Sequence, residues 1–119
     1  MPSKDQHVKK AIDNEEFASN LGDDTQASIN WKLVVFFYAA LHYVEAYLAK
    51  QHNMHLRLHT TRDSEVSREA NLKKIRKQYA HLKFYGFNAR YEVDQFTAKD
   101  TIDAAAYLAQ IRNAIAPLL

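Results

Sequence analysis

Apolar residues recur at helical spacing over most of the chain, and no segment shows the sustained alternation typical of a β-strand. Near the N-terminus, Val8 and Ala11 begin an apolar stripe that predicts an amphipathic helix over about 4–21, ended by Gly22. The segment 31–49 is apolar on every face. We therefore expect it to be the central helix of a bundle, covered by its neighbours on several sides.

A membrane span of about 20 residues is the competing interpretation of segment 31–49. His42, Glu45 and several tyrosine hydroxyls are spread along this segment, and its loss to a membrane would leave the rest of the chain without a core. We therefore expect no membrane association.

Capping signals and apolar spacing predict the helices of the second half. Thr60 and Asp63 fit a capping box, which predicts a helix from about 61 whose charged first turns form a separate short helix. Apolar positions then follow at alternating spacings of three and four: Leu72, Ile75, Tyr79, Leu82 and Gly86. We expect a break at 86–88 and a loop over 89–96.

The last helix has the clearest boundaries. Thr97 and Asp100 form a second capping-box signal, and the apolar stripe that follows runs to about 116, where Pro117 stops the helix.

Composition supports a single helical domain. At 119 residues the chain fits one domain, over 1–119, that is long enough to bury a core. Two Gly and two Pro are too few for the turns of a β-sandwich or barrel, so the predicted fold class is all-α. The absence of Cys removes disulfides, zinc-thiolate sites and thiol catalysis, and no charged segment followed by an apolar stretch opens the chain. We expect a cytoplasmic protein.

The net charge of +2 is unevenly distributed. Residues 50–90 carry ten Lys and Arg against three Asp and Glu, whereas the remainder carries six against eleven. One part of the molecule is therefore basic. This fits an anionic partner such as RNA, DNA or a nucleotide, and it equally fits self-association of a basic face with an acidic one.

The cations gather on the predicted helix whose apolar stripe starts at Leu72. Because that stripe faces inward, the exposed face is positive: Lys73, Lys74, Arg76, Lys77 and Lys83. Phosphate contacts with this face would make nucleic-acid binding salt-dependent and largely independent of sequence. The alternative is an ordinary solvated face.

Three histidines, His52, His55 and His59, would share one face of a helix and could bind a divalent metal as neutral imidazoles. Asn53 favours a turn that breaks this rhythm, and no Asp or Glu between His52 and His59 completes a metal site. We therefore predict no metal site and no cofactor, with these histidines at a helix end or in a loop.

His59 and Arg62 flank the predicted start of the short helix, where free amides and the positive end of the helix dipole favour an anion such as phosphate. The alternative is that Arg62 pairs with a carboxylate of Asp63, Glu65 or Glu92 while His59 packs against the long helix.

His42 and Glu45 lie one turn apart on the apolar helix, where buried polar groups need partners. We expect structural contacts to neighbouring helices, from Glu45 to Arg90 or Arg112, with a functional pair as the alternative.

Four segments together resemble the HEPN-domain superfamily, over about 8–115. They are the aromatic helix Trp31–Ala49, which contains FFYAALHYVEAYLA, then His59-x-x-Arg62, Ala89-Arg90-Tyr91, and Thr97-x-x-Asp100. The resemblance implies an up-and-down bundle of four to five helices that is commonly a homodimer. Superfamily members are often encoded beside minimal nucleotidyltransferases in toxin-antitoxin or defence systems.

Many members of that superfamily are metal-independent ribonucleases with an Arg-x(4–6)-His motif that is paired across the dimer, and others are binding modules. Arg76 and His81 have this spacing, but Lys77 replaces the usual small polar residue. With six Arg and six His in 119 residues, about one such spacing is expected by chance. Arg112 is followed by a small polar residue, Asn113, as in the motif, but position 117 is Pro rather than His. Five positions on one helix also separate Arg76 from His81 by about 140°.

The sequence thus predicts an HEPN-like interaction module, as a homodimer, with RNA, a nucleotide or a nucleotidyltransferase as partner. The expected nucleic-acid or anion face is His59, Arg62, Lys73, Lys74, Arg76, Lys77, Lys83 and Arg90. A ribonuclease that uses Arg76 and His81 is the first alternative, and a scaffold domain without a ligand is the second.

Overall fold

The computed structural model describes residues 2–91, 93 and 95–119, so Glu92 and Asp94 of the predicted loop lie outside the described residues. Within the described part the chain forms five α-helices, two short 3-10 helices and no β-strand, which confirms the all-α fold class. The elements are α1 (Lys4–Asn20), α2 (Gln26–His52), α3 (His59–Arg68), η1 (Lys73–Ile75), α4 (Arg76–Tyr91), α5 (Ala98–Ile115) and η2 (Ala116–Leu118).

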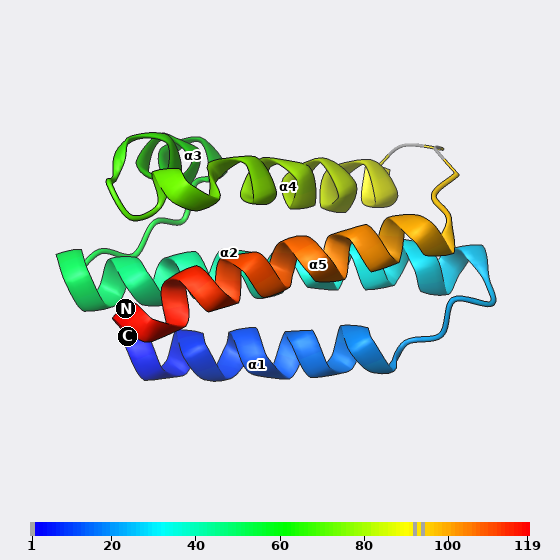
Figure 1. The fold of residues 1–119 in the computed structure, drawn as a ribbon, viewed down its shortest axis with the longest axis horizontal. Coiled ribbons are helices and arrows are strands. Elements are labelled where there is room, and N and C mark those ends of the chain that lie inside the picture. The colour runs from blue at the N-terminus through cyan, green and yellow to red at the C-terminus, as the bar shows by residue number, and fades with distance from the viewer. Residues whose placement is uncertain (1, 92, 94) are drawn as a thin grey trace.

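The four long helices alternate in direction, and α1 and α4 lie on opposite sides of the pair formed by α2 and α5 (Figure 1). α2 contacts α1, α4 and α5, and α4 also contacts α5. The short α3 lies at the end of the bundle where both termini are found (Figure 1). The arrangement is an up-and-down bundle with α3 across one end.

α2 is the central helix, and its length sets the length of the bundle. A helix of 27 residues with a rise of about 1.5 Å per residue matches the 40 Å long axis of the molecule. Large side chains from all round α2 are buried: Leu33, Val34, Phe36, Phe37, Leu41, Val44, Tyr47 and Leu48. By length and composition α2 could cross a membrane, but 72% of its apolar window is buried inside the fold, as expected of a core helix.

Side-chain caps fix the starts of long helices. The Thr25 hydroxyl accepts the Ser28 amide N–H at 3.1 Å, so α2 begins five residues before the apolar segment that predicted it. At the start of α5, the Thr97 amide N–H donates to Asp100 Oδ2 at 2.8 Å, and the predicted capping box is confirmed.

The predicted capping box at Thr60 and Asp63 was wrong. α3 begins at His59, directly after Leu58, and no side chain caps it. The Asp63 carboxylate instead binds the Lys83 ammonium of α4, so a contact between two helices replaces the local cap. The charged segment does form the separate short helix that its pattern predicts.

The predicted break at Gly86 was also wrong. α4 continues through Gly86 to Tyr91, which places Arg90 on the helix rather than in a loop. Gly86 serves helix packing, because a Cβ atom built there would lie 2.8 Å from the Cβ of Phe37 on α2. The missing side chain lets α4 approach α2 closely, a role that turn propensity cannot reveal.

The turn predicted at Asn53 is confirmed. Asn53 adopts the left-handed conformation with φ 50°, and the Met54 amide N–H donates to the Leu48 carbonyl at 3.1 Å. Asn is one of the few residues that enter this region readily, so α2 stops here. At the end of α1, by contrast, Gly22 has no positive φ, and the helix ends at Asn20 without a left-handed glycine.

We expect Gly86→Ala to lower the free energy of unfolding by about 1–3 kcal/mol, because the new methyl group overlaps Phe37 in a packed core. Gly22→Ala is the matched control, since its nearest obstacle is the exposed Asp24 side chain, with Oδ1 at 2.9 Å, which can turn away. Denaturant titration followed by circular dichroism measures both. Equal stability of Gly86→Ala and the unmodified protein would contradict the packing role of Gly86.

A buried histidine, glutamate and arginine cluster as candidate functional site

Six polar side chains from four parts of the chain meet at the end of the bundle near α3. They are His7 of α1, His42 and Glu45 of α2, His55 of the segment between α2 and α3, and His59 and Arg62 of α3. We call this group the His–Glu–Arg cluster.

Glu45 and Arg62 form the buried centre of the cluster. Glu45 is 0% exposed and Arg62 is 4% exposed, and Arg62 Nε donates to Glu45 Oε1 at 2.8 Å. The other carboxylate oxygen, Oε2, accepts the Leu56 amide N–H at 3.1 Å, while Arg62 Nη2 donates to the Leu56 carbonyl. The ion pair therefore holds the segment between α2 and α3 against the core.

The expectation that Arg62 pairs with a carboxylate is confirmed, but its partner is Glu45 rather than Asp63 or Glu65. The fold is the reason. α3 returns across the end of α2, which brings together residues 17 positions apart. Arg62 is thus turned into the protein and not toward a bound anion.

A row of histidines leads from Glu45 toward the surface. His55 Nδ1 lies 3.3 Å from Glu45 Oε2, and His7 Nε2 lies 3.1 Å from His55 Nδ1. The other nitrogen of His7, Nδ1, lies 3.1 Å from His42 Nδ1. Beyond this end of the row lies a hollow of about 300 Å³, lined by Pro2, Gln6, His7, Lys10 and His42.

Burial lowers the pKa of two histidines in this row, His7 and His42. Desolvation lowers the pKa of His42 to about 4. The positive or titratable groups that face His42 add to this decrease: His7, Lys10, Arg62 and His55. Desolvation also lowers the pKa of His7, against the opposing effect of the Glu45 carboxylate. At neutral pH, His7 and His42 are therefore neutral imidazoles.

Three members of the cluster offer donor atoms that a metal ion could share. One ligand atom from each of His7, Glu45 and His55 lies within 4.8 Å of the others. No acidic ligand for His55 lies in the sequence between His52 and His59. Glu45 comes from the preceding helix, and His7 comes from a helix 48 positions away. The sequence does indicate that His7 faces the core, because it lies four positions before Ala11 on the apolar stripe of α1, where both residues are buried.

His52 and His59, the other two of the three histidines at helical spacing, contact different groups. His52 Nε2 lies 3.9 Å from Glu69 Oε1 at the end of α2. The His59 ring packs on Phe37 of the long helix, as the structural alternative expected, and its Nδ1 lies 3.2 Å from Arg62 Nη1. The left-handed turn after α2 is what separates the three side chains.

The structure gives Arg76 and His81 different neighbours on α4. Arg76 lines a hollow of about 220 Å³ between α3 and α4, together with Asp63 and Lys83. His81 stacks on Tyr107 of α5, with ring centroids 4.7 Å apart and ring planes at 6°. Within one chain, the two side chains thus lie on different sides of the helix, as their spacing requires.

The exposed cations at the start of α4 form a distinct surface. We call it the basic patch: Lys73, Lys74, Arg76 and Lys77. Within residues 2–91, 93 and 95–119, no carboxylate oxygen lies within 4.0 Å of these charged groups. The acidic residues of the same region bind other groups: Asp63 binds Lys83, Glu65 binds Arg68, and Glu69 binds the Tyr47 hydroxyl.

Lys83 and Arg90, which were also predicted for the anion face, are partly buried and bind groups of the same chain. Lys83 binds the Asp63 carboxylate, and Arg90 donates to the Tyr38 hydroxyl. The expected contact between Arg90 and Glu45 is therefore wrong. Of the predicted anion face, only the four residues of the basic patch are exposed cations.

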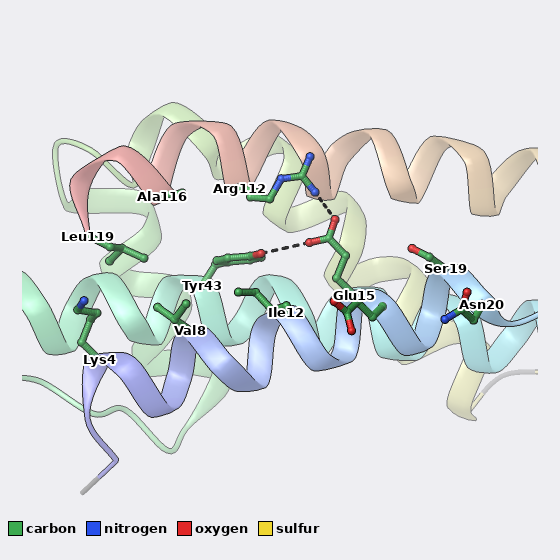
Figure 2. A pocket seen from close by; sticks show the side chains of 11 residues that line it. Lys4, Val8, Ile12, Glu15, Ser19, Asn20, Tyr43, Arg112, Ala116 and Leu119 are labelled. Atoms are coloured by element: carbon green, nitrogen blue, oxygen red, sulfur yellow. Dashed lines mark hydrogen bonds and ion pairs between the residues drawn. The ribbon is translucent and has the colours of Figure 1, made fainter.

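A larger hollow of about 660 Å³ lies between α1 and α5 (Figure 2). At its side, Glu15 of α1 binds the Arg112 guanidinium of α5 and accepts a hydrogen bond from the Tyr43 hydroxyl at 3.1 Å (Figure 2). Burial, followed by the effect of Glu15, raises the pKa of Tyr43 to about 12, so this hydroxyl stays a donor. The expected contact of Arg112 with Glu45 is wrong, and the three groups tie α1, α2 and α5 together.

Comparison with known proteins gives no relative for this chain: no protein-family model, no curated protein and no solved structure matches it. The HEPN resemblance thus stays a prediction from sequence motifs.

We expect Arg62→Met to lower the free energy of unfolding by about 3–5 kcal/mol, because it leaves the Glu45 carboxylate buried without a counter-charge. Arg68→Met is the matched control on the same helix. It removes the pair with Glu65, but the Arg68 side chain is 70% exposed, so the expected loss is about 0–1 kcal/mol. Urea titration measures both variants. A similar loss in both would contradict the central role of the Glu45–Arg62 pair.

A second prediction concerns pH. With EDTA present, the free energy of unfolding should fall as the pH decreases from 6.5 toward about 4. In that range the unfolded His42 takes up a proton while the folded one resists it, so the unfolded state binds more protons. His42→Asn should reduce this part of the pH dependence in urea titrations at several pH values. An unchanged dependence would show that other groups cause the acid sensitivity.

Proposed function

We propose that this protein is an HEPN-like interaction module that binds RNA through the basic patch. The observation that carries the proposal is a local excess of exposed positive charge. The four cations of the patch have no carboxylate partner in the described part of the chain, while neighbouring acidic residues are already bound. A surface of this kind attracts a polyanion and holds it through its phosphates.

The position of the patch supports phosphate contacts rather than readout of bases. Its side chains project from η1 and the first turn of α4, and Ile75, between them in sequence, is buried in the core. The patch is therefore carried on a fixed backbone. Lysine and arginine contacts to phosphate carry no sequence information, so we propose binding without strong sequence preference.

The HEPN resemblance motivates the remaining parts of the proposal. A homodimer would present the basic patch twice, and two linked patches bind one RNA chain more tightly than either patch alone. A nucleotidyltransferase with an acidic surface is the proposed protein partner, and it would compete with RNA for the same cations. Catalysis is not part of the proposal, because Arg76 and His81 lie apart on α4.

We expect the combined change Lys73→Gln, Lys74→Gln, Arg76→Gln and Lys77→Gln to abolish most RNA binding. Each lost contact to single-stranded RNA should reduce the slope of log K against log salt by about 0.7, so four contacts reduce it by about 3. Fluorescence anisotropy with a labelled single-stranded RNA, at several salt concentrations and in EDTA, measures the affinity and the slope.

The matched control is Lys9→Gln with Lys99→Gln, which removes exposed lysines from α1 and α5. This variant should bind RNA like the unmodified protein. Equal losses in both variants would assign binding to general charge rather than to the basic patch, and no RNA binding by the unmodified protein at low salt would refute the proposal. The RNA should remain intact on a gel after incubation in EDTA, since cleavage would support the ribonuclease alternative.

A further inference from the structure

We propose that His7, His55 and Glu45 form a binding site for a divalent transition-metal ion, with Zn²⁺ as the representative. Two imidazoles and one carboxylate are a donor set that zinc accepts in proteins, with a fourth position left for water. The inference goes beyond RNA binding, because the basic patch contains none of these three residues.

The spacing of the donor atoms fits a tetrahedral ion. Bonds of about 2.0–2.1 Å from zinc to nitrogen or oxygen place neighbouring ligand atoms about 3.3–3.4 Å apart. His7 Nε2 and His55 Nδ1 lie 3.1 Å apart, and His55 Nδ1 and Glu45 Oε2 lie 3.3 Å apart. All three donor atoms lie within 4.8 Å of one another, so a small movement of side chains completes the site. Its donors come from α1, α2 and the segment that follows α2.

The number of ring hydrogens available to His7 and His55 explains why a cation would be favoured between these histidines and Glu45. If His7 Nδ1 donates to His42, then the hydrogen on His55 Nδ1 must serve two acceptors, His7 Nε2 and Glu45 Oε2. The reverse assignment places a lone pair of His55 Nδ1 against the carboxylate at 3.3 Å. In both cases one hydrogen lies between three atoms that carry lone pairs: His7 Nε2, His55 Nδ1 and Glu45 Oε2. A Zn²⁺ ion takes the place of the shared hydrogen and bonds to all three atoms. The hydrogen moves through solvent to the other nitrogen of the same ring, so both histidines bind the ion as neutral imidazoles.

His42 is the positioning residue for this site. Histidines that bind a metal through one ring nitrogen usually donate a hydrogen bond from the other, which fixes the tautomer and the ring orientation. His7 Nδ1 faces His42 Nδ1 at 3.1 Å, so His42 can accept that hydrogen. The hollow of about 300 Å³ lies beside His7 and His42, at the end of the histidine row away from Glu45.

Arg62 orients the carboxylate ligand. It donates to Glu45 Oε1, whereas Oε2 is the oxygen that faces His55. Oε2 accepts one hydrogen bond, from the Leu56 amide, and keeps a second lone pair for the ion. The guanidinium charge opposes a nearby cation, so Arg62 moderates the affinity for the ion while its hydrogen bond holds the Glu45 carboxylate in this orientation.

The test is a calorimetric titration with Zn²⁺ of protein without a histidine tag, after metal removal with EDTA and dialysis. We expect one ion per chain. His55→Ala should weaken binding by about 100-fold or more, because it removes a direct ligand. This variant leaves the Glu45–Arg62 pair in place, and circular dichroism checks that it folds. His52→Ala is the matched control from the same region, and it should bind Zn²⁺ like the unmodified protein.

X-ray absorption spectroscopy of the unmodified zinc complex provides a measurement that needs no variant. We expect two imidazole ligands, with the remaining ligands oxygen, at about 2.0–2.2 Å. The proposal is overturned by less than one ion per chain, by unchanged affinity in His55→Ala, or by a spectrum without two imidazoles. RNA binding is measured in EDTA, so its result and the zinc result stand independently.

Discussion

The burial of α2 on every side is the constraint on which this structure depends. A helix without a polar face cannot lie on a surface, so each of its sides needs an apolar neighbour. α1, α4 and α5 provide these neighbours, and short connections make α1 antiparallel to α2 and α4 antiparallel to α5. The close approach of α4 at Gly86 follows from the same demand, since Phe37 occupies the space that a side chain at position 86 would fill.

The same constraint decides where polar chemistry occurs. The polar groups on α2 cannot all reach water, and unpaired polar groups in a core are costly. Each is met by a group from another part of the chain: Tyr43 by Glu15, Tyr47 by Glu69, and Glu45 by Arg62. The polar contacts of α2 therefore link it to other parts of the chain. Where several of them gather at the end covered by α3, they form the His–Glu–Arg cluster.

Two regions of opposite character result from this arrangement. In the cluster, the Glu45 carboxylate pairs with one guanidinium and contacts the His55 imidazole, and the pKa values of His7 and His42 further along the row are lowered. On the surface of α4, the basic patch keeps its charges in water and free of carboxylates in the described part of the chain. The first region suits a small cation bound by directed donors. The second suits a flexible polyanion held by long-range attraction.

The sequence by itself determined the all-α fold, the central position of the long apolar helix, the turn at Asn53, the capping box of α5 and the exposed basic patch. These features depend on local backbone preferences and on the spacing of apolar residues, which are visible in any short window of sequence. Only the tertiary structure decided that Gly86 lies inside a helix, that Asp63 binds Lys83 instead of capping α3, and that Glu45 pairs with Arg62. It also brought His7 beside His55, across 48 positions. Such contacts join residues that are far apart in sequence. They depend on how α1, α3 and α4 pack against α2 and one another, and no local pattern carries that information.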